Sequence, residues 1–207
     1  MKIRQIALIA LIAIALASGT AIATDTEEPL KLVKAKLTEI TEIINNKNID
    51  QVKKRVMIIE TVRPLFDLPL MAKLTLGKKH WTALSEDQRQ QFTKLYSDHL
   101  EKSSIGKVEL YANDKIDFKP PVKKKNKVYV PTELTSEGQV MPITYKFYQS
   151  KNGWKIYDAE INGTSVILSN RSEYDAILRN GSIDDLLTKL KQSLMTPVQA
   201  NEVRVER

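Results

Sequence analysis

Histidine and cysteine decide which chemistry this chain could perform. The sequence has no cysteine and two histidines, His80 and His99. Thiolate nucleophiles, disulfides and cysteine-based metal sites are therefore excluded. The G-x-S-x-G and H-E-x-x-H motifs and a glycine-rich phosphate loop are also missing from the sequence. A catalytic acid–base pair could be formed only by His99 with Tyr96 or Asp98. Because His99 lies on the apolar stripe of its helix, a structural role in the core is favoured. We therefore predict no catalytic residue, no metal and no cofactor, and keep an exported enzyme as an alternative.

A lysine-rich segment at 119–127 is the strongest charge feature. The whole chain has 32 Lys and Arg against 25 Asp and Glu, a formal net charge of +7. Pro120 and Pro121 favour a solvated loop between strands. Docking onto anionic lipid headgroups or an acidic partner is the alternative, since each lysine near a membrane surface adds about 1 kcal/mol. Nucleic acid fits poorly, because the segment lacks interleaved aromatic residues. The docking candidates are Lys119, Lys123, Lys124, Lys125 and Lys127.

The N-terminus has the three parts of a secretory signal peptide. Two basic residues precede an uncharged apolar run at 6–17, and small residues follow up to Ala23. A membrane-spanning helix needs about 20 apolar residues, more than this run supplies. We predict cleavage after Ala23, so that residues 1–23 are removed and 24–207 form a single domain with a frayed tail at 196–207. The lack of cysteine suits a bacterial periplasmic location.

Hydrophobic periodicity predicts helices at both ends of the exported chain. Apolar residues three and four positions apart indicate one buried face per helix. Ser85 with Gln88 forms a capping box, which predicts the start of a further helix that ends before Gly106. The other predicted helices cover 29–44, 49–65, 70–81, 172–178 and 183–194.

After Gly106 the period becomes two, which predicts strands. An Asn-Gly pair at 152–153 predicts a hairpin turn. Helices followed by an antiparallel meander and a helical end predict an α+β fold, with one sheet wrapped around helices. The predicted strands cover 108–110, 116–118, 128–130, 140–149 and 154–158.

Apolar side chains gather on one face of the later strands. Alternation places Met141, Ile143, Tyr145 and Phe147 on the same face, and Trp154 and Ile156 likewise point together. An ordinary packed core explains such a face. The same residues would line a binding site only if the core were hollow.

Several different short motifs follow one another along the chain in a particular order. They run from Val62 to Asp67, from Leu76 to Trp81 and from Gln88 to Phe92, followed by Asn152-Gly153-Trp154-Lys155-Ile156-Tyr157-Asp158. Their combination resembles the MlaC family of periplasmic phospholipid-binding proteins, also called the toluene-tolerance auxiliary family. The family's N-Y-R-x-x-F helix start is matched imperfectly by Ser169-Asn170-Arg171-Ser172-Glu173-Tyr174. The resemblance covers nearly all of the chain after the signal peptide.

The resemblance implies a cone-like fold, with N-terminal helices packed on a curved antiparallel sheet, C-terminal helices and one apolar cavity. It implies a soluble carrier that shields the acyl chains of a phospholipid. The implied partners are an inner-membrane ABC transporter complex with an MCE-domain subunit and an outer-membrane lipoprotein–porin complex, between which lipid moves to maintain outer-membrane lipid asymmetry. An exported enzyme on a cone-shaped fold and a periplasmic interaction protein that docks through its basic loop remain alternatives.

The candidate lining residues come from the predicted apolar faces of helices and strands. We expect a minority of them to touch lipid and the rest to be ordinary packing. They are Phe66, Leu70, Met71, Leu74, Phe92, Tyr96, Val128, Val130, Met141, Ile143, Tyr145, Phe147, Trp154 and Ile156.

Overall fold

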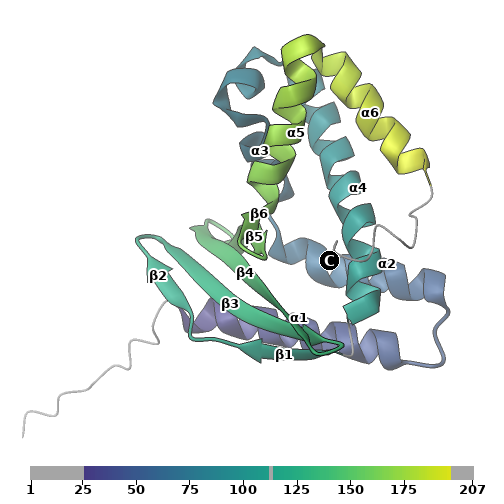
Figure 1. Ribbon diagram of the computed structural model, residues 1–207, viewed down its shortest axis with the longest axis vertical. Helices are drawn as coiled ribbons and strands as arrows, with labels where there is room; N and C mark the ends of the chain where they lie inside the picture. Colours follow the sequence, from purple (N-terminus) through teal and green to yellow (C-terminus); the bar gives the residue numbers. More distant parts are fainter. Residues whose placement is uncertain (1–25, 112–113, 197–207) are drawn as a thin grey trace, which may run out of the picture.

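Helices precede and follow one antiparallel sheet (Figure 1). The computed structural model describes residues 26–111 and 114–196. The helices are α1 (Glu27–Asn45), α2 (Gln51–Val62), the 3-10 helix η1 (Arg63–Leu65), α3 (Leu68–Ala83), α4 (Glu86–Tyr111), α5 (Val166–Asn180) and α6 (Ile183–Met195). The strands are β1 (Lys115–Phe118), β2 (Val122–Lys124), β3 (Lys127–Ser136), β4 (Gln139–Ser150), β5 (Gly153–Ile161) and β6 (Thr164–Ser165). The predicted α+β class is confirmed. The predicted signal peptide at 1–23 and residues 197–207 of the predicted tail lie outside the described residues.

Side-chain caps fix where the N-terminal helices begin. Asp50 and Asp67 each accept a hydrogen bond, 2.9 Å long, from the backbone N–H three residues further on. The predicted capping box is present in both directions, with Ser85 and Gln88 joined by bonds of 3.1 and 3.2 Å. Each cap satisfies backbone donors that a helix start would otherwise leave unpaired. The chain therefore changes direction at defined corners, which sends α1 and α2 to one part of the molecule and α3 and α4 towards another.

The sheet is built around β3 and β4. β3 pairs along its whole length with β4, and β5 and β6 extend the sheet beyond β4. On the other side of β3, β1 and β2 share the same edge, β1 pairing with its second half and β2 with its beginning. The predicted turn between β4 and β5 has Gly153 at φ +90°, a conformation that suits glycine. The α1 helix runs along this sheet, while α3, α5 and α6 stand above it in Figure 1.

A β-bulge keeps the inner face of the sheet apolar. Lys146 lies opposite Asp158, but the next residue, Phe147, lies opposite Ile156, so Tyr157 is the extra residue on β5. Residues directly opposite one another share a face. Ile156 therefore faces inward before the bulge, and Ala159 and Ile161 face inward after it, whereas the buried Asp158 lies on the opposite face of the sheet, 2.9 Å from Lys146.

Most of the buried apolar residues in the described part of the chain form two clusters. One joins the sheet to α1 and η1 and contains Val33, Leu65, Val128, Val130, Phe147, Trp154 and Ile156. The other, which we call the helical core, lies between α3, α4, α5 and α6 and contains Met71, Ala72, Leu76, Leu84, Phe92, Leu95, Tyr96, Ile167, Tyr174, Leu186, Leu187 and Leu190. The α4 helix connects the two parts, because its first half packs in the helical core and its second half reaches α2 and the sheet.

Three sequence predictions differ from the structure. The strand predicted at 108–110 is wrong, since α4 continues through Gly106 to Tyr111. Ile105, Val108 and Tyr111 are three residues apart, so the helical period fits this segment as well as alternation does. The lysine-rich segment is a loop only in part: residues 119–121 lie outside the strands, but β2 pairs with β3 as a hairpin whose turn has Lys125 at φ 59°. The helix predicted at 172–178 begins earlier, because the Ser165 side chain caps it by accepting from the Leu168 N–H at 3.2 Å.

Candidate functional site

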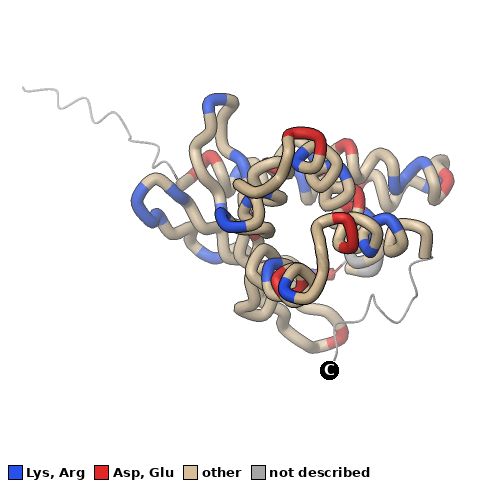
Figure 2. The backbone as a smooth tube through the Cα atoms, turned by 90° about the horizontal axis from the view of Figure 1, so that it is seen from above, with Lys and Arg blue, Asp and Glu red and all other residues tan. Residues whose placement is uncertain are grey.

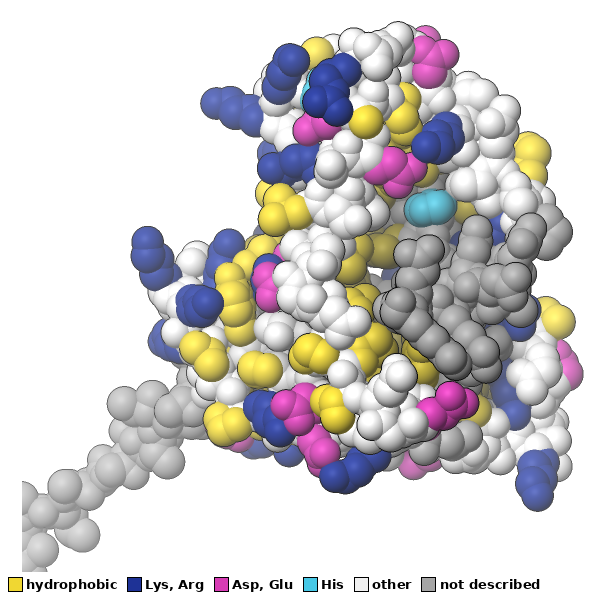
Figure 3. Space-filling model, in the orientation of Figure 1, with side chains coloured by type: hydrophobic (Ala, Val, Ile, Leu, Met, Phe, Trp, Pro, Cys, Tyr) yellow, Lys and Arg dark blue, Asp and Glu magenta, His cyan; other side chains and the backbone are white. Residues whose placement is uncertain are grey.

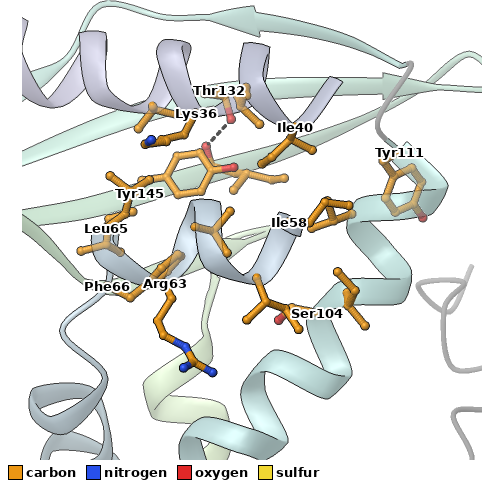
Figure 4. A pocket seen from close by; sticks show the side chains of 18 of the residues that line it. Lys36, Ile40, Ile58, Arg63, Leu65, Phe66, Ser104, Tyr111, Thr132 and Tyr145 are labelled. Atoms are coloured by element: carbon orange, nitrogen blue, oxygen red, sulfur yellow. Dashed lines mark hydrogen bonds between the residues drawn. The ribbon is translucent and has the colours of Figure 1, made fainter. Parts of the chain in front are cut away.

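A cavity of about 280 Å³ lies between the sheet and the helices α1, α2 and α4. The inner face of β1, β3, β4 and β5 forms one wall, and α1 and α2 form the opposite wall. The second half of α4 closes a third side. Figure 4 shows Ile40 from α1, Ile58 from α2 and Tyr145 from β4 around this space. Figure 3 shows apolar side chains in the recess between the upper helices and the lower part of the molecule.

The lining of the cavity is apolar. Most of it consists of Val, Leu, Ile, Met and aromatic side chains. Its two threonines satisfy their hydroxyls on the backbone: Thr132 Oγ1 donates to the Ile143 carbonyl at 3.0 Å, and Thr41 Oγ1 donates to the Leu37 carbonyl at 2.9 Å. Burial raises the pKa of Tyr145, which lines the cavity from β4, to about 12. Such a surface favours hydrocarbon and offers little to a polar ligand.

Charge is confined to a few places on this lining. Among the described lining residues, the charged ones are Lys36, Arg63 and Glu101. Lys36 pairs with Glu39 on its own helix at 2.8 Å. Arg63 and Glu101 pair with each other, joining η1 to α4. The remaining surface can therefore enclose a long apolar ligand without burying an unpaired charge.

The mouth of the cavity, which we define by Arg63, Glu101 and Ser104, lies between η1 and α4. Arg63 Nε and Nη2 donate to the two carboxylate oxygens of Glu101 at 2.8 and 2.7 Å. The hydrogen bond that Arg63 donates to Glu101 and the negative charge of that carboxylate raise the pKa of Arg63. The Arg63 side chain is 57% exposed, and Ser104 is exposed, so the cavity reaches the surface here.

Five of the predicted lining residues come together at the cavity. Phe66, Met141, Ile143, Tyr145 and Ile156 all line it. The structure therefore gathers the predicted face of β4 and the corner before α3 at one place. Contact of these side chains with lipid stays a prediction.

The other nine predicted lining residues lie elsewhere. Met71, Phe92 and Tyr96 belong to the helical core, and Leu74 packs against it. Leu70 lines a separate pocket between α3 and α4 together with Trp81 and Arg89. The remaining four, which pack between the sheet and α1, are Val128, Val130, Phe147 and Trp154.

The main wall that sequence reasoning missed comes from α1, α2 and the end of α4. Each contributes residues three or four positions apart, such as Val33, Leu37 and Ile40 on α1. In the sequence, that spacing predicts the helices. The same spacing also identifies the inward face of each helix. It does not show whether that face contacts other side chains or lines a cavity.

The five lysines predicted as docking candidates lie at one end of the sheet. Figure 2 shows Lys and Arg gathered at the left, where the β2–β3 hairpin lies. Lys124 Nζ lies 4.7 Å from the centre of the Tyr129 ring, and Lys127 Nζ lies 4.3 Å from that of Tyr157. Lys119 pairs with Glu133 at 2.6 Å. Lys123 and Lys125 are exposed on the hairpin.

The histidines lie away from the cavity. His99 Nδ1 is 3.0 Å from Ser193 Oγ, between α4 and α6. His80, on α3, pairs with Asp175 on α5 at 3.2 Å. Within residues 26–111 and 114–196, histidine and carboxylate side chains form no group of three that could hold a metal ion. In the same part of the chain, no helix combines the length and the apolar character that crossing a bilayer requires.

The fold and the cavity together define a class of small α+β domains that enclose an apolar ligand between helices and a sheet. Residues 34–192 match the family model described as "MlaC protein", so the chain belongs to the MlaC family. It is 25% identical over 154 residues, 72% of each chain, to the intermembrane phospholipid transport system binding protein MlaC of Haemophilus influenzae. Its fold is similar to that of a phospholipid-binding protein from Ralstonia solanacearum solved in complex with a phospholipid, with a TM-score of 0.70 and 19% identity over 83% of this chain and 97% of that one.

Proposed function

We propose that this protein is a soluble periplasmic phospholipid carrier. The observation that carries the proposal is the apolar cavity between the sheet and α1, α2 and α4, found in a chain of the MlaC family. A relative is named as a phospholipid transport binding protein, and the structure with a similar fold holds a phospholipid. The acyl chains would occupy the cavity, and the headgroup would stay at the mouth.

The energetics explain why such a carrier needs an apolar lining. Exposing a methylene to water costs about 0.8 kcal/mol, so a two-chain phospholipid with roughly 30 methylenes would cost about 24 kcal/mol in free transit. Apolar walls such as those formed by Ile40, Ile58 and Ile143 remove most of that cost. The protein itself consumes no energy, so the direction of transfer depends on its partners.

The size of the cavity implies that the walls move when lipid enters. At about 280 Å³ it falls just below the usual range for ligand pockets, about 300–1,000 Å³. Two long acyl chains need more room than this, and we propose that α1 and α2 separate from α4 to admit them. Affinity near the practical ceiling would prevent release, so a wall that opens also serves handover.

We further propose where the carrier works and what it meets. Removal of residues 1–23 would deliver 24–207 to the periplasm as a single domain. There it would exchange lipid with an inner-membrane ABC transporter complex bearing an MCE-domain subunit and with an outer-membrane lipoprotein–porin complex, maintaining outer-membrane lipid asymmetry. The basic β2–β3 hairpin supports docking to acidic surfaces of such partners, through Lys119, Lys123, Lys124, Lys125 and Lys127.

A vesicle assay tests the carrier function. Protein corresponding to 24–207 is mixed with vesicles containing a fluorescent phospholipid, and lipid extracted into the soluble fraction is measured. We expect stoichiometric extraction by the unaltered protein and severalfold less by Ile143→Trp, which fills the cavity from β4. Leu168→Trp, at a side chain 60% exposed on α5, is the matched control and is expected to extract normally. Unaltered protein that extracts no phospholipid would contradict the proposal.

Charge reversal separates docking from lipid binding. We expect Lys123→Glu, Lys124→Glu and Lys125→Glu together to slow transfer to partner complexes while leaving vesicle extraction unchanged, because these lysines are not part of the cavity lining. Unchanged transfer to both partner complexes would remove the hairpin from the docking surface.

A further inference from the structure

The guanidinium of Arg63, at the mouth of the cavity, has a donor geometry that also fits anions other than the Glu101 carboxylate. Both Nε and Nη2 of Arg63 donate to the carboxylate of Glu101, at 2.8 and 2.7 Å. This two-pronged arrangement binds phosphate oxygens as well as carboxylate oxygens, because the guanidinium donors are fixed in one plane. Arg63 is therefore a candidate for a phosphate group that arrives at the mouth.

The position of Arg63 matches the boundary between lipid tail and headgroup. The side chain lines the cavity yet is 57% exposed, whereas the Glu101 side chain is 15% exposed. Figure 4 shows Arg63 extending away from Tyr145 in the direction of α4. A lipid with its chains between Tyr145 and Ile58 would have its polar end where the apolar lining stops, which is at Arg63.

Lys36, the other cation on the described lining, is less suited to this role. Its ammonium bonds both carboxylate oxygens of Glu39 at 2.8 Å within α1, and its side chain is 29% exposed. An ammonium also lacks the planar pair of donors. Arg63 is thus the lining cation with both the geometry and the access.

We propose that Arg63 binds the phosphodiester of the bound lipid, and that Glu101 occupies the same donors when the cavity is empty. This inference rests on the proposed function and assigns its headgroup contact. The exchange replaces one pair of charge-assisted hydrogen bonds by another, so it changes little in the number of bonds. It also releases α4 from η1, at the place where the walls must part for two acyl chains, and lets water reach Glu101.

The experiment compares two lipids with the same chains. Dioleoyl phosphatidylcholine carries an anionic phosphodiester in a lipid of zero net charge, and dioleoylglycerol carries no phosphate. Uptake of each from vesicles is measured over a range of lipid concentration. We expect Arg63→Met to weaken phosphatidylcholine binding about tenfold, the effect of losing a charge-assisted hydrogen-bond pair, and to leave dioleoylglycerol binding unchanged. Arg179→Met, at an exposed arginine of α5 outside the lining, is expected to change neither.

Glu101→Gln distinguishes phosphate binding from a structural role of the pair. It removes the same ion pair as Arg63→Met but leaves the guanidinium available, so we expect phosphatidylcholine binding to strengthen. A purely structural pair would make both variants weaken binding of both lipids, and that result would overturn the inference. Unchanged phosphatidylcholine binding by Arg63→Met would also overturn it. Unaltered protein that takes up neither lipid would instead contradict the proposed function.

Discussion

The helical core and the cavity are built from the same kinds of side chain but packed differently. In the helical core, Phe92 and Tyr96 are fully buried, their rings stack at 6.0 Å, and Tyr174 meets Phe92 edge-on at 6.0 Å. Around the cavity, Met141 and Ile143 lie on the inner face of the sheet but remain partly accessible. Composition therefore does not decide which region is filled.

The difference follows from how closely the surrounding elements pack around each space. Helices α3, α4, α5 and α6 surround the helical core, and their side chains interlock. At the cavity, α1 and α2 face the sheet, and α4 reaches them with its second half, where Arg63 and Glu101 join η1 to α4. We infer that the helical core supplies rigidity and that the more loosely closed walls supply the binding site.

The largest effect should come from emptying the helical core. We expect Phe92→Ala to lower the free energy of unfolding by about 3–5 kcal/mol, because a fully buried ring leaves a new cavity. Ile143→Ala enlarges a space that already exists, so we expect it to cost less than about half of that. Urea unfolding followed by circular dichroism measures both. Equal losses would mean that the two regions are equally well packed.

Adding volume should give opposite results in the two regions. We expect Leu187→Phe, in the helical core, to cost about 1–3 kcal/mol of stability because it overpacks a filled space. Ile161→Phe, on the cavity lining, should leave stability unchanged or raise it, and should reduce lipid extraction. The unfolding midpoint and the vesicle assay report these two quantities. Destabilisation by Ile161→Phe as large as that by Leu187→Phe would show that the cavity has no spare room.

These contrasts also show how far the sequence can be interpreted. Caps and periodicity located the N-terminal helices and the Asn-Gly hairpin, since local hydrogen bonds and burial set them. The inward face of β4 was likewise predictable from alternation. The sequence could not predict whether Tyr96 or Tyr145 lines a cavity, because that depends on elements distant in the sequence. The strand predicted at 108–110 failed for a related reason: its alternation also fits a helix, and the position of α2 and the sheet decides which face is buried.

A smaller effect is expected at the bend of α3. Gly77 has φ +69° there, and Arg171 of α5 donates from Nε to the Leu74 carbonyl at 3.1 Å. Arg171→Ala leaves that carbonyl without this partner, so we expect a loss of about 1–2 kcal/mol with unchanged lipid extraction. A clear loss of extraction in a folded variant would show that the helical core also takes part in binding.

The smallest effect should be a pH dependence at the start of α6. Hydrogen bonds from the Ser182 backbone and side chain lower the pKa of Asp185. Its contribution to stability is therefore present above the unfolded-state pKa of about 3.9 and lost as the pH falls through the lower folded-state value. We expect Asp185→Asn to be slightly less stable than the unaltered protein at pH 7 and equal to it near pH 2, in unfolding curves at both pH values. If the difference in stability between Asp185→Asn and the unaltered protein persisted at pH 2, the charge of this carboxylate could not be the source of that difference.

The most direct measurement is native mass spectrometry of the protein purified from a bacterial periplasm, followed by extraction and identification of any bound lipid. The hollow between the sheet and the helices predicts one phospholipid held per protein molecule, and its loss in Ile143→Trp. A well-folded protein that emerges empty, and stays empty after incubation with phospholipid vesicles, would contradict the account.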